Sequence, residues 1–291
     1  MQCFGMTLET SIAMNRVLYT LALSMAWVGH LWAGTLELQG QPVQGGLMQG
    51  RTDPGTEVTF DGRPVRVSKD GVFLIGFGRD APAQTKLVVT FTDGSREWRE
   101  LKVGQRKYKI QRIDGLPPRK ISPSEEDLAR IHRESASIKE ARTKDDARTD
   151  FLKGFIWPAK GRISGIYGSQ RILNGEPRRP HYGLDIAAPV ETPVVAPASG
   201  IVTLTHPDMF YSGGTLILDH GHGLSSTFIH LHRILVKEGQ YVRQGDVIAE
   251  IGATGRVTGP HLDWRINLFK RRLDPQLILK AMPASAKQVS N

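Results

Sequence analysis

The stretch "GPHLDWRI", Gly259–Ile266, places a His and an Asp two residues apart, between a Gly-Pro pair and a Trp. Side chains two residues apart in a β-strand point to the same face, so His261 and Asp263 would lie together. Trp264 would point to the opposite face, where we expect it to pack in the core rather than to contact a substrate. The stretch is therefore expected to be a strand, either an ordinary one or one that carries half of a metal site on one face.

A second pair of the same kind stands earlier, in "HYGLD", His181–Asp185. The spacing of four places both side chains on one strand face, and a helix would also bring them together. Gly183 and the following "AAPVETP" argue against a helix. Two such strand pairs can converge on one ion, and a catalytic zinc uses three protein ligands and a water.

The cysteine count limits the ligands of any metal. The only cysteine, Cys3, lies before an apolar segment that we expect to be removed, so the mature chain would have none. A disulfide framework and a thiolate zinc site are thereby excluded. His, Asp or Glu must supply the ligands.

Seven of the nine histidines lie after residue 150. His230, in "FIHLH", is placed to take a proton from an activated water and to stabilise an oxyanion. His206, His220 and His222 are expected to have structural roles, and the last two fall in a hairpin loop, "LDHGHG". His232 shares a strand face with His230 and is either a spare ligand or a neighbour.

The sequence around these motifs predicts a mainly β chain. From residue 34 to 115 apolar and polar residues alternate, as in "TKLVVTFT", and Asp-Gly pairs interrupt them, which is typical of hairpins in an antiparallel β-sandwich. This region has no clustered His or carboxylates, so we expect a structural or binding role. Residues 151–283 form short apolar runs broken by Gly and Pro, which predict a second antiparallel β domain, with a tail at 284–291.

Residues 116–150 predict a Pro-rich linker and a connector helix. Ser122 is the expected N-cap, with Pro123 in the first helical position and Glu125 completing a capping box. The apolar residues Leu128 and Ile138, with Ile131 between them, form one narrow stripe, so the helix is expected to lie across a domain surface. A wholly solvated linker remains an alternative.

The N-terminal segment 1–33 has the pattern of a signal peptide, with Met14 as a second candidate start. Arg16 precedes an apolar run, and Ala33 and Gly34 offer small residues for cleavage. An uncleaved membrane anchor is the alternative, and it would be the chain's one link to a membrane. Either interpretation predicts an exported protein in the periplasm or cell envelope.

The formal net charge of +9 indicates an anionic partner. Lys and Arg are dispersed and no nucleic-acid recognition motif accompanies them, so we expect no nucleic-acid partner. An exported basic protein would instead meet anionic cell-wall polymer. Arg178 and Arg179, beside His181, are expected to orient acidic groups of a substrate.

Four ordered motifs between residues 161 and 275 resemble the LytM/lysostaphin-type zinc metallopeptidases, which cleave peptide bonds of bacterial peptidoglycan. They are "HYGLDIAAPVETPVVAPASGIV", "LILDHGHGLSSTFIHL", "VKEGQYVRQGDVIAEIGATG" and "GPHLDWRI". The resemblance implies a catalytic domain of the LytM/lysostaphin type with one Zn²⁺ per chain. It makes His181 and Asp185 zinc ligands, and it makes His230 and His261 catalytic imidazoles.

The family's third ligand is the second His of an H-x-H motif, and Asp263 stands at that position. Asp is a competent zinc ligand and keeps the required strand face. Two carboxylates formally cancel the charge of Zn²⁺, so a bound water should be less acidic than beside two imidazoles. We expect a working peptidase with an altered pH optimum or metal preference.

Three other functions are weighed against this zinc endopeptidase of peptidoglycan peptides. A non-catalytic cell-wall factor of the same fold, which binds or activates another murein hydrolase, is the main alternative. A biotinyl or lipoyl carrier would need a Lys at a turn between apolar residues, and "VKEGQYVRQGDVIAEI" has no such turn. The Gly-rich "GATGRVTG" lacks the Gly-Lys-Ser/Thr ending of a phosphate loop.

Overall fold

The computed structural model describes residues 34–116, 119 and 122–282. The predicted signal segment, Cys3 and the tail 284–291 lie outside these residues. Among the described residues, no helix combines the length and the apolar character needed to span a lipid bilayer.

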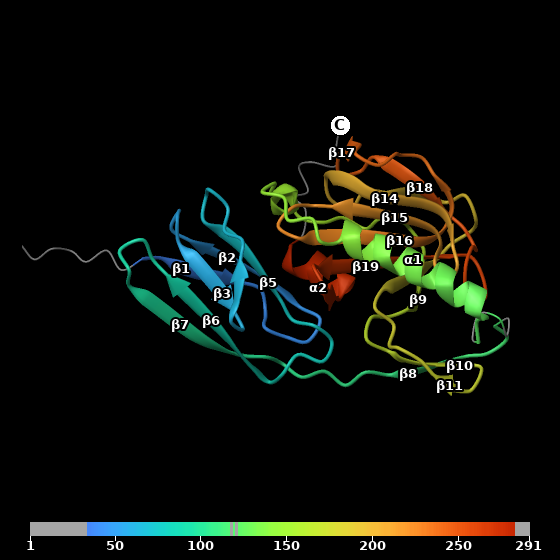
Figure 1. The fold of residues 1–291 in the computed structure, drawn as a ribbon, viewed down its shortest axis with the longest axis horizontal. Coiled ribbons are helices and arrows are strands. Elements are labelled where there is room, and N and C mark those ends of the chain that lie inside the picture. The colour runs from blue at the N-terminus through green and yellow to red at the C-terminus, as the bar shows by residue number, and fades with distance from the viewer. Residues whose placement is uncertain (1–33, 117–118, 120–121, 283–291) are drawn as a thin grey trace, which may run out of the picture. The chain divides into compact units, whose positions relative to one another are not determined.

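The N-terminal strands form two antiparallel sheets (Figure 1). One hydrophobic cluster is built from both. One sheet has the order β1-β2-β5 and the other the order β4-β3-β6-β7. The cluster takes side chains from both sheets, including Met48, Phe73, Phe60 and Leu87. The strands are β1 (Leu36–Gln39), β2 (Leu47–Thr52), β3 (Glu57–Phe60), β4 (Arg63–Val65), β5 (Val72–Gly76), β6 (Gln84–Thr90) and β7 (Arg96–Lys102).

Two of the Asp-Gly pairs make hairpins between these strands. Asp61 and Gly62 join β3 to β4, and both have positive φ, 49° and 71°, as a two-residue type I′ turn requires. Asp93 and Gly94 join β6 to β7, with positive φ at the glycine alone of the two. The sandwich predicted from these pairs is confirmed.

The connector helix α1 (Glu125–Ala141) begins two residues later than the sequence predicted. Its N-cap is Ser124, and the capping box closes on Asp127 rather than on Glu125. Asp127 also accepts two hydrogen bonds from the Arg119 guanidinium, at 2.7 and 2.5 Å. This second contact favours the later cap over the Ser122 box, because the carboxylate serves the helix terminus and an arginine at once.

Helix α1 packs on a sheet, so the interpretation of this segment as a wholly solvated linker is wrong. Ile138 and Ala141 lie against Leu204, Met209 and Ile217 of the large sheet. Leu128 is 43% exposed, so only the C-terminal part of the apolar stripe is covered.

The C-terminal half is built on a ten-stranded sheet with the order β17-β14-β15-β16-β19-β12-β9, to which β13, β18 and β20 attach (Figure 1). Its strands are β9 (Arg162–Gly165), β12 (Leu184–Ala187), β13 (Pro193–Val195), β14 (Gly200–Met209), β15 (Gly213–Asp219), β16 (Leu224–Ile234), β17 (Tyr241–Val242), β18 (Val247–Ile251), β19 (His261–Leu268) and β20 (Arg271–Leu273). All of its pairings are antiparallel, as predicted.

A smaller three-stranded sheet contains one parallel pair. Strand β8 (Ile110–Ile113) runs parallel to β10 (Gln170–Leu173), which pairs antiparallel with β11 (Glu176–Pro177). The short 3-10 helix η2 (Asp150–Lys153) precedes the large sheet, and α2 (Pro275–Ala281) follows it.

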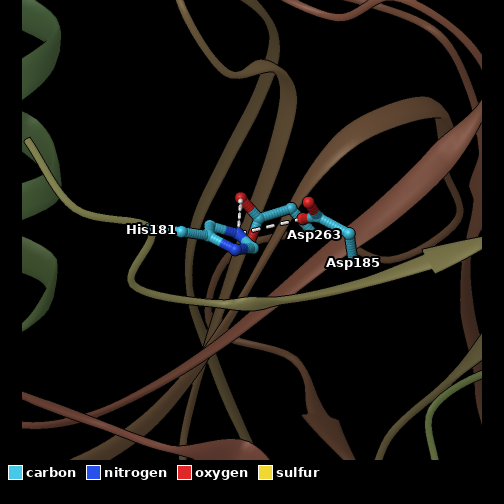
Figure 2. A group of neighbouring side chains, drawn as sticks. All are labelled: His181, Asp185 and Asp263. Atoms are coloured by element: carbon cyan, nitrogen blue, oxygen red, sulfur yellow. Dashed lines mark hydrogen bonds and ion pairs between the residues drawn. The ribbon is translucent and has the colours of Figure 1, made fainter. Parts of the chain in front are cut away.

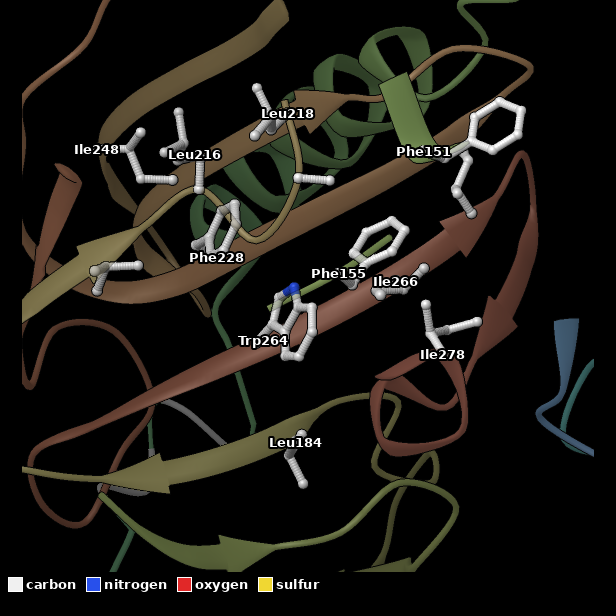
Figure 3. Close-up of a cluster of buried hydrophobic side chains, with 14 of the residues drawn as sticks. Phe151, Phe155, Leu184, Leu216, Leu218, Phe228, Ile248, Trp264, Ile266 and Ile278 are labelled. Carbon is white, nitrogen blue, oxygen red and sulfur yellow. The ribbon is translucent and has the colours of Figure 1, made fainter. Parts of the chain in front are cut away.

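The two faces of the large sheet differ in character. Leu262, Trp264 and Ile266 of β19 point into the main core, where Trp264 packs with Phe228 and Phe155 (Figure 3). The alternate residues of β19, Asp263 and its i+2 neighbours, therefore lie on the opposite face. This is also the face that α1 covers, because Ile217 under α1 pairs with Thr227, and Thr227 pairs with Arg265.

Candidate metal centre

Asp185 and Asp263 stand directly opposite each other on the adjacent strands β12 and β19. Their side chains therefore project from the same face of the sheet, next to one another. His181 precedes β12 in an irregular segment, so the strand parity used to place it beside Asp185 does not apply. Its position is fixed instead by its backbone N–H, which donates to the Ser169 carbonyl at 2.8 Å.

These three side chains form one compact, buried cluster (Figure 2). His181 Nε2 lies 3.0 Å from Asp185 Oδ1 and 3.4 Å from Asp263 Oδ2. One ligand atom of each residue lies within 4.8 Å of the others. Three donors bound tetrahedrally at ordinary zinc distances would be about 3.3 Å apart, so the spacing fits a single small cation.

The donor set also has the chemistry that a metal requires. His181 Nδ1 lies 3.2 Å from the Ile166 carbonyl, which only accepts, so this contact assigns the proton to Nδ1 and leaves the Nε2 lone pair toward the carboxylates. Asp185 Oδ1 is buried and has no hydrogen-bond donor among the described residues. A cation held between these atoms would satisfy both.

Two arginines offset the charge of the carboxylates. Arg265 Nε and Nη2 donate to Asp263 Oδ1 and Oδ2 at 3.0 and 2.6 Å. Arg171 Nη2 donates to Asp185 Oδ2 at 3.2 Å and leaves Oδ1 free. Burial would raise the pKa of Asp263, but the Arg265 guanidinium outweighs it and holds that pKa well below its usual range.

The sequence interpretation missed both arginines. Arg265 could have been found, because it lies two residues after Asp263 on the same strand face. Arg171 comes from β10, which no local pattern relates to Asp185. Together they reduce the excess negative charge that the change from His to Asp was expected to bring to the site.

His230 and His261 lie beside the cluster, with ring centroids 4.9 Å apart. His230 Nδ1 lies 2.8 Å from the Thr254 carbonyl, and His261 Nδ1 lies 2.9 Å from the Gly259 carbonyl. Both contacts assign the proton to Nδ1, which leaves each Nε2 free to accept one. His261 Nε2 is 3.9 Å from Asp185 Oδ1.

The backbone holds His230 in an unusual conformation. Its φ is +67°, and the register between β16 and β15 shifts across it, between Phe228 and Leu231. Its N–H donates to the Ser212 carbonyl at 2.8 Å. Burial lowers the pKa of His230 to about 3, so its imidazole is neutral at neutral pH. Strain of this kind in a non-Gly residue occurs often at functional sites.

The remaining histidines stand outside this cluster. His220 is buried between the Ser199 carbonyl and the Ser226 hydroxyl, both at 2.8 Å. His222 lies in the same loop as His220, between β15 and β16, as predicted, and its ring packs on Phe151. The side chain of His232 is 47% exposed and lies 3.7 Å from Glu191, so it is not a spare ligand.

The two arginines predicted to bind substrate have different surroundings. The backbone N–H of Arg178 donates to the Arg171 carbonyl at 2.9 Å, which fixes its segment beside β10. Arg179 lines a cavity on the face of the sheet that carries Asp263. Their role toward a substrate stays a prediction.

Comparison with known proteins assigns the chain to a family. The profile of Peptidase family M23 matches residues 179–275, which include every residue of the cluster. Peptidoglycan DD-endopeptidase ShyA of Vibrio cholerae is 40% identical over 111 residues, which are 37% of this chain and 25% of ShyA. DD-carboxypeptidase/endopeptidase Mpg of Neisseria meningitidis is 36% identical over 122 residues, 42% of this chain and 28% of Mpg. The chain thus matches only about a quarter of the length of these curated relatives.

A solved structure extends the match over most of the chain. A candidate M23 peptidase from Pseudomonas aeruginosa, known from a crystal structure, is 31% identical to this chain in sequence, and the two structures superpose with a TM-score of 0.65. The alignment covers 84% of this chain and 97% of that one. The chain therefore belongs to peptidase family M23.

Proposed function

We propose that this protein is a zinc-dependent endopeptidase that hydrolyses peptide cross-links or stem peptides of bacterial peptidoglycan. The observation that carries the proposal is the buried cluster of His181, Asp185 and Asp263 with two imidazoles beside it. Three ligands from two separate parts of the chain, with proton acceptors next to them, are what a hydrolytic metal site needs.

Zinc is the cation that suits this donor set best. Zinc accepts both imidazole nitrogen and carboxylate oxygen as ligands, and three protein ligands with an open fourth position are usual at a catalytic zinc. When bound, zinc would lower the pKa of a water and polarise a scissile carbonyl.

The two imidazoles would handle the protons. His230 and His261 each offer a free Nε2, held by a carbonyl at Nδ1, so either can accept a proton and return it to the leaving amine. A protonated imidazole would also stabilise the negative charge on the tetrahedral intermediate. Arg178 and Arg179 would orient acidic groups of the substrate.

The relatives support the proposed substrate and location. ShyA and Mpg are named as a peptidoglycan DD-endopeptidase and a DD-carboxypeptidase/endopeptidase. Peptidoglycan peptides would be reached only outside the cytoplasm, which agrees with the signal segment predicted at 1–33. We also propose the domain limits 34–115, 116–150 and 151–283. The hydrophobic cluster between Leu36 and Val103 supports the first of these domains.

Release of muropeptides from purified sacculi tests the activity. We expect the zinc-loaded protein to release them and His261→Ala to abolish release. His232→Ala is the matched control, because this exposed imidazole lies outside the cluster and its loss should leave the rate unchanged. Release that survives His261→Ala would refute the proposed chemistry.

Direct titration separates the enzyme from a non-catalytic factor of the same fold. We expect the purified protein to bind one zinc per chain and Asp185→Asn to lose it. A protein that binds sacculi but neither binds zinc nor releases muropeptides would be the cell-wall factor instead.

A further inference from the structure

A cavity of about 680 Å³ lies beside the candidate metal centre, on the face of the large sheet that α1 covers. Thr227 and Ile229 of β16 and Arg265 and Asn267 of β19 form its floor, and Ile138 and Arg142 belong to the α1 side. Arg265 is shared, because it lines the cavity and also holds Asp263. A molecule in this cavity would therefore lie next to the proposed site of hydrolysis.

The lining is cationic to an unusual degree. Among the residues that the structure describes, no Asp or Glu lines the cavity, whereas nine Arg and Lys residues do, Arg66, Arg142, Arg265 and Arg272 among them. Several of these have carboxylate partners outside it, such as Asp145 for Arg66. Like charges at such density repel one another, and an anionic ligand between them would reduce that repulsion.

Two of these guanidinium groups each contain one buried nitrogen without a hydrogen-bond partner among the described residues. Arg142 Nη2 donates to the Thr227 hydroxyl at 2.9 Å, but its Nε has no hydrogen-bond partner among the described residues. Arg272 Nη1 is likewise buried without one. Burial and the neighbouring cations lower the pKa of both side chains, that of Arg272 to about 10. Both side chains also line the cavity, so a carboxylate bound there would meet guanidinium groups whose hydrogen bonds within the protein are incomplete.

Apolar side chains fill the space between the cations. Val65, Leu74, Ile138 and Leu268 all line the cavity. The volume also far exceeds that of one phosphate group, and an inorganic anion would leave this apolar surface in contact with water. An organic ligand that carries acidic groups on an apolar frame fits both features.

We infer that this cavity binds the free carboxylates of the peptide substrate, with Arg142 and Arg272 as their principal partners. The inference rests on the proposed peptidase function, because it makes the cavity an extension of the cleavage site. Guanidinium groups suit the task, since they match a carboxylate with two parallel N–H donors. The protein would then select peptides with acidic groups near the scissile bond.

Two synthetic peptides test the inference by fluorescence anisotropy on the zinc-free protein, so that no cleavage occurs. One is fluorescein-labelled Ala-Glu-Ala-Glu-Ala, and the other is its twin with Gln in place of both Glu. We expect the Glu peptide to bind at least about tenfold more tightly than the Gln peptide, because the Gln peptide cannot form the charge-assisted hydrogen bonds. Arg142→Met and Arg272→Met should each remove most of that difference, and Arg142→Lys should restore part of it.

Arg243→Met is the matched control, because Arg243 is exposed, lies outside the cavity and changes the net charge equally. It should bind the Glu peptide as the unmodified protein does. A thermal melt shows whether each variant is folded. If Arg142→Met does not fold, Arg272→Met provides the test in its place.

Each other outcome overturns the inference. Equal binding of the two peptides, or an equal loss with Arg243→Met, would reduce the effect to general charge. Displacement of the Glu peptide by an equal concentration of inorganic phosphate would make the cavity a simple anion site. Zinc binding and muropeptide release are measured separately, so the peptidase proposal can fail while the carboxylate site stands, and the reverse.

Discussion

Replacing Asp263 by Asn tests the ion pair that joins a candidate metal ligand to the cationic cavity. Asn keeps the shape of the side chain but removes its charge, so the Arg265 guanidinium would lose the partner it now holds at 3.0 and 2.6 Å. Both groups are largely buried, and breaking such a pair from one side costs about 3 kcal/mol or more. We therefore expect the free energy of unfolding of the zinc-free protein to fall by about that amount.

The magnitude can be assigned to the pair through a double-mutant cycle. Arg265→Met should also destabilise, because two buried carboxylates would then share only Arg171 and His181. The double variant should cost less than the sum of the two, with a coupling on the order of 2 kcal/mol. Urea unfolding in a chelator, followed by tryptophan fluorescence, measures all four proteins, and Trp264 is a fully buried reporter.

The exposed pair Arg233–Glu250 provides a control with similar geometry, at 3.1 and 2.6 Å. Glu250→Gln should shift the unfolding midpoint much less, because water screens this pair. Strict additivity of the two single substitutions at 263 and 265 would refute the reasoning. So would a loss with Glu250→Gln as large as that with Asp263→Asn.

The remaining predictions concern pH, packing and the connector helix. Burial lowers the pKa of His220 to about 4, from about 6.5 in the unfolded chain. The free energy of unfolding should therefore be constant above pH 6.5 and fall by about 3 kcal/mol toward pH 4. In His220→Gln this free energy should change less across the same range. Gly183→Ala would set a Cβ 1.9 Å from Asp263 Oδ1, so the affinity for zinc should fall by about tenfold or more, as measured by competition with a chelating dye. Gly259→Ala is the control, because its Cβ would meet nothing within 4 Å and zinc should bind as before. Ser124→Ala removes the N-cap of α1 and should lower stability by about 1 kcal/mol in urea unfolding.

The sequence predicted the features that depend on local pattern. The alternation in β19 placed Asp263 and Trp264 on opposite faces, and the Asp61-Gly62 pair marked a hairpin whose two residues have positive φ. Side-chain direction in a strand and turn conformation are set within a few residues, so a single sequence carries them.

Features that depend on distant parts of the chain were missed. Arg171 reaches Asp185 from another sheet, and α1 covers the metal-bearing face through contacts between residues far apart in the sequence. The predicted start of α1 was wrong because Ser122 and Ser124 can both cap the helix, and the contact of Arg119 with Asp127 favours Ser124. Local propensity cannot weigh such a contact.

The arginines at the candidate metal centre also bear on how the protein would tolerate chelation. Asp185 and Asp263 each have a guanidinium donor that comes from the protein itself. Withdrawal of the cation would therefore leave neither acid without a counter-charge, unlike a small zinc finger that unfolds when stripped. Metal loss and reloading should be a reversible cycle on an already folded scaffold, which would let the protein survive scarcity of the ion and recover when supply returns.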